Sequence, residues 1–455
     1  MPDAPGMFST TIGCPSPRDT PSANNRAITS VAAPGPVGTI SLTGRLGQLW
    51  GSAGATAASI AQRKAQQSGS TRQRLLTETP VVSFALCQCI VTGGDRKRME
   101  NRMSGELLLV GSIPLDTPQE VFQTFGAPLA QYLFAMPDGE VGPRRHWVSR
   151  VHYQVLAGHP ELDVVQRPAP DEHGVERQFP RNAADAWWFK VKDGVKQVRF
   201  GDPGWRLGYA RDAINSYFVF NVMKEKGILP PHLRFQVSIP MVNSVLPPRI
   251  FPNRDDLDKI RPGYEAATRA EIAKIVEKIP PSELAIQWDC STEVQDSYGA
   301  IPGFPLEGAV ERNLSEVRNL APHIPTDVAL GYHFCFGTLG GWPRFAPDDL
   351  GQAVKLANAF VAASGRRVDW IHVPVLDRSD DAFFAPLKEL APQGARVYLG
   401  LIHNMERLKE RIAIARKYLP EFGLGAYCGF GRLPASELPN ILADHHKAVE
   451  IAAPH

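Results

Sequence analysis

From residue 107 onward, eight short apolar runs alternate with stretches that have the periodicity of amphipathic helices. Most of the runs are apolar on both faces, as expected for parallel strands covered by helices. The runs comprise residues 107–111, 132–136, 233–239, 284–288, 328–332, 368–375, 397–402 and 424–427. The helix-like stretches include residues 266–278, 306–320, 350–363 and 405–418. Eight strands that mostly lead into helices predict a (β/α)8 TIM barrel, an α/β fold.

The interval between the second and third runs is much longer than the others. It contains the aromatic sequence Trp187-Trp188-Phe189, followed by Asp193-Gly194. An Asp-Gly pair between apolar segments is typical of a hairpin turn. We therefore expect an excursion at about residues 150–230 that covers the barrel mouth, with a hairpin across residues 187–198.

Residues 1–102 differ in character from the rest of the chain. They are rich in Gly, Ala, Ser, Thr and Pro, carry 11 basic and 5 acidic side chains, and show little periodicity. Such a segment cannot bury enough apolar surface to offset its chain entropy. We expect a low-complexity, disordered extension at 1–102 and a barrel domain at 103–455. An organelle transit peptide, or a translation start at Met103, are the alternatives.

Charge and cysteine content exclude several classes of protein. The chain has 49 basic and 47 acidic side chains, a net charge of +2, so neither nucleic acid nor an anionic membrane surface is an expected partner. No apolar run reaches the roughly 18 residues that cross a bilayer. Six cysteines in 455 residues do not form a disulfide framework. We therefore expect a cytoplasmic protein in which a functional cysteine is a metal ligand or a nucleophile.

Three soft donors follow strands of the predicted barrel, where the functional loops of such barrels lie. His333 and Cys335 end the fifth run, and side chains two apart on an extended segment point to the same side. Cys428 follows the eighth run, which shares the mouth of a closed barrel. One His and two Cys suit Zn²⁺. The alternative is that both cysteines are ordinary buried thiols.

Other polar residues also follow predicted strands. Asp289 comes after an apolar run and would be costly to bury without a cation or donors, which favours a role in a site. Glu140 closes a Pro-Asp-Gly-Glu sequence that can serve equally as a simple turn. His403 ends the seventh run and faces the same mouth, with a core histidine as the alternative.

These motifs resemble the catalytic barrel of cobalamin-independent methionine synthase. The chain resembles more closely the stand-alone methionine synthase II-like proteins of the uroporphyrinogen decarboxylase/methionine synthase-like superfamily. The resemblance extends over about 350 residues, from Leu107 to the C-terminus. The motifs that carry it are Val110-Gly111-Ser112, Asp138-Gly139-Glu140, Gln287-x-Asp289, Gly331-Tyr332-His333-Phe334-Cys335, Leu401-Ile402-His403 and Cys428-Gly429.

The resemblance implies a metal site and a proton donor. His333, Cys335 and Cys428 match three zinc ligands, and His403 matches a histidine that protonates the leaving amine of the folate. Zinc lowers the pKa of a bound thiol, which provides a thiolate nucleophile at neutral pH. A methyl group on a tertiary amine is a poor electrophile until the nitrogen is protonated, so a general acid is required.

The resemblance also implies a pocket for an amino-acid thiol. Glu140 and Asp289 match carboxylates that hold its amino group, and the main chain around Gly111 and Ser112 would hold its carboxylate.

Two positions depart from the family pattern. The family has a glutamate as the fourth zinc ligand, where this chain has Pro374; His372 or Asp377 are the candidate replacements. Cys290 stands where the family usually has an acidic residue, and Glu293 is the candidate to supply part of what is lost.

The sequence therefore predicts a zinc-dependent methyltransferase-like enzyme, similar to homocysteine S-methyltransferases of methionine biosynthesis. Its expected partners are a small-molecule thiol and a folate-type methyl donor. Two alternatives remain: a metal-free decarboxylase-type barrel, and a barrel that binds a thiol or a folate-like ligand without turnover.

Overall fold

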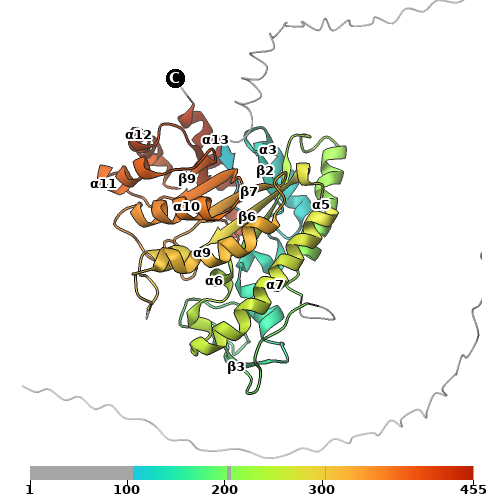
Figure 1. Ribbon diagram of the computed structural model, residues 1–455. Helices are drawn as coiled ribbons and strands as arrows, with labels where there is room; N and C mark the ends of the chain where they lie inside the picture. Colours follow the sequence, from blue (N-terminus) through green and yellow to red (C-terminus); the bar gives the residue numbers. More distant parts are fainter. Residues whose placement is uncertain (1–105, 202–205, 303, 454–455) are drawn as a thin grey trace, which may run out of the picture. The chain divides into compact units, whose positions relative to one another are not determined.

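The centre of the molecule is a nearly closed barrel of eight parallel strands. The computed structural model describes residues 106–201, 206–302 and 304–453. The strands follow the order β1-β10-β9-β8-β7-β6-β5-β2, and a parallel bridge from Leu107 to Leu133 links the two edges (Figure 1). The strands are β1 Leu107–Leu108, β2 Ala135–Pro137, β5 Arg234–Pro240, β6 Leu284–Cys290, β7 Ala329–Phe334, β8 Trp370–Pro374, β9 Arg396–Ile402 and β10 Gly423–Ala426. The predicted (β/α)8 barrel is confirmed, with each strand at its predicted run.

Helices cover the outside of the barrel. The long ones are α5 Tyr209–Glu225, α7 Arg254–Lys278, α9 Ala309–Leu320, α10 Gly351–Ala363, α12 Leu408–Tyr418 and α13 Leu438–Ala452. The short ones are α2 Pro118–Glu120, α3 Ala127–Leu129, α4 Ser149–Val151, α6 Val242–Val245, α8 Thr292–Ser297 and α11 Asp381–Phe384. All four predicted helical stretches fall in this set, in α7, α9, α10 and α12. The extension expected at 1–102 lies outside the described residues.

The barrel interior is packed at one end and polar at the other. A small apolar cluster that includes Trp370 and Tyr398 fills the end where the strands begin. A Cβ atom at Gly331 would lie 1.9 Å from the Trp370 ring, so only glycine leaves room for this indole. Above it, the Nε2 atom of Gln287 donates to the Val110 carbonyl at 2.6 Å. The Gln287 side chain therefore lies between the apolar cluster and the barrel mouth.

The segment between β2 and α5 pairs differently from the prediction. It contains β3 (Leu162–Gln166) and β4 (Trp188–Val191), which form an antiparallel sheet with each other. The hairpin predicted across residues 187–198 is therefore wrong. The chain after the Asp193-Gly194 turn leaves β4, and Val198 N donates instead to Lys259 O of α7 at 3.0 Å. Helix α5 packs against β5 and α7 and is thus part of the barrel, not of the excursion.

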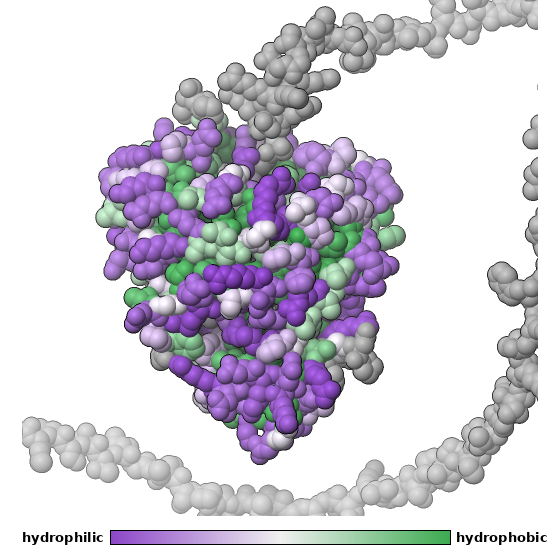
Figure 2. All heavy atoms as spheres, viewed as in Figure 1, coloured by the Kyte–Doolittle hydropathy of each residue, from purple (hydrophilic) through white to green (hydrophobic). Residues whose placement is uncertain are grey.

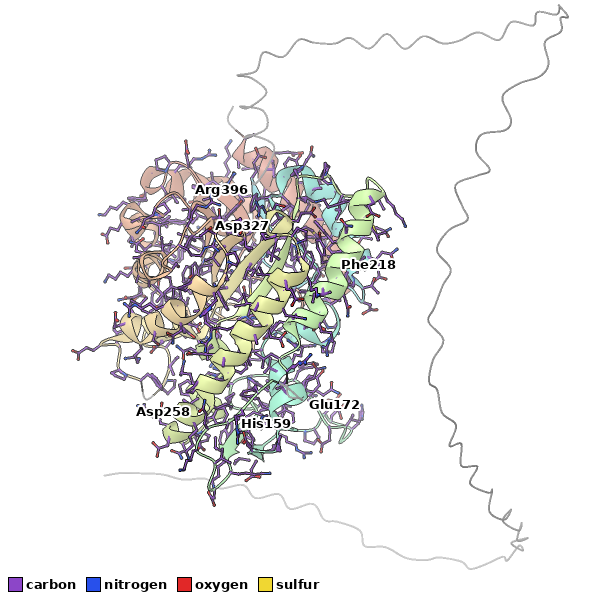
Figure 3. All side chains as sticks on the ribbon, turned by 45° about the vertical axis from the view of Figure 1, so that its right-hand side comes forward. His159, Glu172, Phe218, Asp258, Asp327 and Arg396 are labelled. Carbon is purple, nitrogen blue, oxygen red and sulfur yellow. The ribbon has the colours of Figure 1, made fainter. Side chains whose placement is uncertain are left out.

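This segment lies at the end of the barrel where the strands finish. Figure 3 shows Asp327 and Arg396, at the starts of β7 and β9, at the top of the view. His159 and Glu172 of the segment lie at the bottom, beside Asp258 of α7 (Figure 3). On the face shown in Figure 2, hydrophilic side chains predominate and apolar ones form separate groups. Within the described ranges, no helix is both long enough and apolar enough to span a membrane.

Candidate metal centre and substrate cavity

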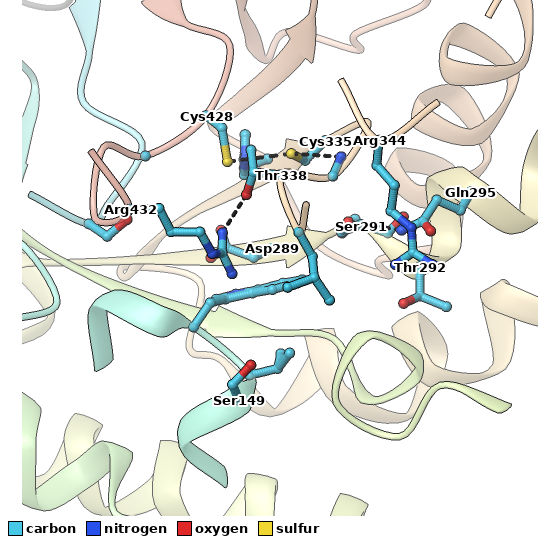
Figure 4. A pocket seen from close by; sticks show the side chains of 18 of the residues that line it. Ser149, Asp289, Ser291, Thr292, Gln295, Cys335, Thr338, Arg344, Cys428 and Arg432 are labelled. Atoms are coloured by element: carbon cyan, nitrogen blue, oxygen red, sulfur yellow. Dashed lines mark hydrogen bonds between the residues drawn. The ribbon is translucent and has the colours of Figure 1, made fainter. Parts of the chain in front are cut away.

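Three soft donor side chains meet where β7 and β10 end. His333, Cys335 and Cys428 each offer one nitrogen or sulfur atom, and these atoms lie within 4.8 Å of one another. The two sulfur atoms are 3.4 Å apart (Figure 4). His333 and Cys335 are buried, and Cys428 is partly exposed toward a cavity. One imidazole and two sulfurs at such separations form a donor set that fits Zn²⁺.

A hydrogen bond joins the two cysteines. The hydrogen bond from the Cys335 thiol holds the pKa of Cys428 well below its usual range. The same bond, together with burial, raises the pKa of Cys335. The main-chain N–H of Gly337 also donates to the Cys335 sulfur at 3.2 Å. The lowered pKa favours the thiolate form of Cys428, which is the form that binds metal ions.

A second histidine sets the tautomer of His333. His372 Nε2 lies 2.9 Å from the Ala426 carbonyl and can only donate there, which leaves its Nδ1 as an acceptor. His333 Nδ1, 2.8 Å from that atom, must then be the donor. His333 Nε2 consequently carries a lone pair. This atom is buried and has no hydrogen-bond partner among the described residues. An imidazole that donates from one nitrogen and presents the other is the usual form of a metal ligand.

Neither candidate for the fourth ligand joins the cluster. Both ring nitrogens of His372 are used in the bonds described above, and burial keeps its pKa well below the usual range. Asp377 accepts from Asn404 Nδ2 at 2.6 Å and lies near Arg407, with 43% of its side chain exposed. In the part of the chain that the structure describes, the group has three protein donors. Zinc held by these three donors would keep a fourth position for a substrate or water, as in catalytic zinc sites.

Two carboxyl groups lie beside the cluster. Glu140 adopts a left-handed conformation (φ 47°), and its N–H donates to Asp138 Oδ1 at 2.9 Å. This turn brings its carboxylate against Gly111, where an added Cβ would lie 2.1 Å from Oε1. Burial raises the pKa of Glu140 to about 8. Burial and the charge of Glu140 raise the pKa of Asp289 well above its usual range, so the two carboxyls interact closely.

Ser112 is held by the loop that follows β10. Its Oγ accepts from the N–H of Gly431 at 3.2 Å, and its carbonyl accepts from the N–H of Phe430 at 2.6 Å. Both Ser112 and Gly429 line the cavity. The segments after the neighbouring strands β1 and β10 thus form one wall, which also carries Cys428.

Glu293 is not part of this cavity wall, contrary to its predicted role in the substrate pocket. It lies on the far side of α8, fully buried, where Ser244 Oγ donates to it at 2.6 Å. It interacts there with Glu316 of α9, and burial raises its pKa to about 6. The neighbouring α8 residues Thr292 and Gln295 line the cavity instead.

His403 also lies off the cavity wall. Its Nε2 is 2.8 Å from the Val375 carbonyl, and the guanidinium of Arg411 contacts both ring nitrogens. Its ring stands edge-on to Tyr427, with centroids 5.8 Å apart. Burial, reinforced by Arg411, lowers the pKa of His403 to about 4. The residue predicted as a proton donor is therefore a neutral imidazole that is tied to the protein.

The cavity encloses about 890 Å³, part of which is open to solvent. His333, Cys335, Cys428, Glu140 and Asp289 all line it. Figure 4 shows three of them, Cys335, Cys428 and Asp289. The remaining walls of the cavity come from the segment after β2, including Trp147 and Ala186, and from the loops after β5, β6 and β7.

Four arginines line this cavity that were not predicted as site residues: Arg145, Arg249, Arg344 and Arg432. The neighbour of Arg145 in the sequence, Arg144, instead forms an ion pair with Asp138 at 2.7 Å. Arg249 lies on a short turn, Pro248–Ile250, well beyond the end of β5. No pattern in the sequence indicates that this turn reaches the barrel mouth.

Comparisons with known proteins give likeness at the level of structure only. No protein-family model and no curated protein matches the chain. One similar solved structure is a B12-independent methionine synthase from Shewanella sp. W3-18-1 in complex with selenomethionine; it is 13% identical, covers 77% of this chain and 96% of its own, and has a TM-score of 0.48. Another, from Listeria monocytogenes, is assigned as a vitamin-B12-independent methionine synthase; it is 18% identical, covers 76% and 97%, and has a TM-score of 0.45. At such values the function must be argued from the site itself.

Proposed function

We propose that this chain is a zinc-dependent methyltransferase that moves a methyl group from a folate-type donor to a thiol, as homocysteine S-methyltransferases do. One observation carries the proposal: an imidazole and two cysteine sulfurs converge at the barrel mouth. The lone pair of His333 Nε2 has no hydrogen-bond partner among the described residues and is therefore available to a metal ion. Zinc bound there would lower the pKa of a substrate thiol, which would then react as a thiolate at neutral pH.

The neighbouring carboxyls fit the amino group of an amino-acid thiol. Asp289 is buried and Glu140 partly buried; the two interact with each other and line the cavity. A buried carboxylate without a cation is unfavourable, and a substrate ammonium group would supply the missing charge. Gly111 and Ser112 lie on the same wall, where the carboxylate of such a substrate would be held by main-chain groups. Protonation of the leaving amine is not assigned to His403, because that imidazole does not line the cavity.

Metal content tests the proposal. Protein purified without chelators should carry about one zinc per chain, and Cys428→Ser should reduce it to a small fraction. Cys290→Ala is the matched control, because Cys290 is also buried and lines the cavity but does not join the cluster. Absence of zinc from the wild-type protein, or equal retention by both variants, would overturn the proposal. Methyl transfer to homocysteine is then measured on the zinc-loaded protein.

The arginines of the cavity favour the metal-free decarboxylase as the second candidate, because such enzymes bind polycarboxylates through cationic side chains. That function has no need of the sulfur and nitrogen cluster. Catalysis of decarboxylation by a protein with both His333 and Cys335 replaced by alanine would decide for it.

A further inference from the structure

Arg249 presents an unusual guanidinium to the cavity. The side chain is partly buried, and its Nε atom is fully buried without a hydrogen-bond partner among the described residues. No carboxylate of the described chain lies within ion-pair distance of it. Two other arginines have protein partners: Arg312 pairs with Asp296 at 2.7 Å, and Arg366 donates to three main-chain carbonyls. A cation left without partners in a partly desolvated position carries an energetic cost.

A second guanidinium lies nearby. Arg344 belongs to the loop after Cys335, and its main-chain N–H donates to Gly337 O at 3.0 Å. Its side chain extends toward Thr292 and Gln295 (Figure 4). Its guanidinium makes no hydrogen bond or ion pair within the described ranges, and it lines the same cavity as Arg249.

The two positive charges act on each other and on a third group. Burial and the charge of Arg344 lower the pKa of Arg249 to about 9. Burial, with a further contribution from Arg249, lowers the pKa of His152 on the cavity wall to about 4. Two like charges in one partly desolvated place repel each other, and the protein provides no acid to offset this. The carboxyls of the cavity, Glu140 and Asp289, interact with each other and with Cys428.

We propose that Arg249 and Arg344 form a binding subsite for an anionic group, a carboxylate or a phosphate, on the second substrate of this enzyme. Guanidinium groups bind both anions through paired N–H donors. The Thr292 hydroxyl lies on the same wall and offers a further donor. This inference rests on the proposed function, because it describes the methyl donor: a molecule with a negatively charged arm that reaches the arginines while its methyl group faces the cysteines.

Anion binding to the full-length protein tests the subsite. Inorganic phosphate and glutarate are titrated separately by calorimetry, with the ionic strength held constant with sodium chloride. We expect saturable binding of at least one of them, and the tighter of the two identifies the anion as phosphate or carboxylate. Arg249→Gln and Arg344→Gln should each weaken this binding at least about tenfold, the range of a charge-assisted hydrogen bond. Arg318→Gln is the control, since Arg318 lies on the surface of α9 and pairs with Glu311; it should bind as the wild type does.

A melting experiment without added anion separates binding from a structural role. If Arg344 serves the ligand, Arg344→Gln should melt at the same or a higher temperature, because a repulsion is removed. A lower melting temperature, an absence of saturable binding, or full affinity in both arginine variants would overturn the inference. Zinc content is measured in the same samples. Retained zinc with no anion binding would refute the subsite alone, whereas anion binding that depends on the arginines in a zinc-free wild type would refute the proposed function alone.

Discussion

Two pairs of carboxyl groups in this barrel, each buried or partly buried, have similar electrostatics and different surroundings. Glu140 and Asp289 lie on the cavity wall, and Glu293 and Glu316 lie behind it, between α8 and α9. Burial raises the pKa of all four. The hidden pair receives three protein donors: Ser244 donates to Glu293 at 2.6 Å, and Asn243 donates twice to Glu316 at 3.0 Å. Glu293 Oε1 has no hydrogen-bond partner among the described residues.

The pair on the cavity wall has far fewer donors. Asp289 accepts from Gln287 Nε2 at 2.9 Å, and no hydrogen bond from a described residue to the Glu140 carboxylate is resolved. Perturbed pKa values alone therefore do not distinguish a site from a structural pair. The distinction lies in position: Glu140 and Asp289 line the cavity, where a ligand can reach them, whereas Glu293 and Glu316 do not.

The largest difference between the pairs is expected in substrate affinity. Asp289→Asn removes a charge that would hold the substrate ammonium, and we expect KM for homocysteine to rise about 100-fold, the value of a charged hydrogen bond. Glu293→Gln, the matched change in the hidden pair, should alter KM by less than about threefold. Steady-state kinetics on the zinc-loaded variants measures both. Equal effects at the two positions would show that the pairs do not differ in function.

Two buried histidines also differ in whether they support the candidate site: His372 does, and His445 does not. His372→Ala leaves His333 Nδ1 without its acceptor, so the lone pair on Nε2 is no longer enforced. We expect zinc affinity to fall about 10- to 100-fold, as is typical when the partner of a ligating histidine is removed. His445→Gln serves as the control, because His445 is also buried and bonded to a carbonyl, Ile441 O at 2.7 Å, but lies on α13 away from the cluster. Competition with a chromogenic chelator measures the affinities, and equal values for both variants would contradict this role of His372.

The hidden pair should instead determine the pH dependence of stability. Burial raises the pKa of Glu293 from 4.5 to about 6, so the folded state binds this proton more tightly than the unfolded state does. The resulting stability is present below about pH 4.5 and is lost as the pH rises through about 6. Glu293→Gln should therefore raise the free energy of unfolding by ~2 kcal/mol at pH 7 and change it little at pH 4. Urea unfolding at both pH values measures this, with the exposed Glu311→Gln as the control; equal shifts at both pH values would refute the explanation.

The strands were predictable because a strand that is buried on both faces appears in the sequence as a nearly continuous run of apolar residues. In β6, for example, all residues from Leu284 to Cys290 are buried, and the sequence is apolar over most of that length. The convergence of His333 with Cys335 and Cys428 followed from the same logic, since barrel closure brings the ends of β7 and β10 to one mouth.

The predictions that were wrong or incomplete concerned contacts that no local sequence pattern encodes. The partner of β4 is β3, which precedes it by more than a short turn, whereas Asp193-Gly194 suggested a neighbour on the other side. Glu293 lies four residues after Asp289, but a short helix turns its side chain away from the cavity and toward α9. Arg249 reaches the cavity from a turn beyond the strand end, so a survey of strand ends alone overlooks it.

The smallest effect is expected at His403, which the resemblance assigned as the proton donor. A general acid contributes about 10²- to 10⁴-fold and works best with a pKa near the operating pH, whereas burial and Arg411 lower the pKa of His403 to about 4. Its ring is bonded to Val375 O and lies off the cavity wall, as the carboxyls of the hidden pair do. We therefore expect His403→Gln to change kcat for methyl transfer by less than about threefold. A loss of about 100-fold in kcat with unchanged KM and zinc content would mean that the loop after β9 rearranges to bring this imidazole to the substrate. His403 would then be a functional residue like Asp289, and not a structural one like Glu293.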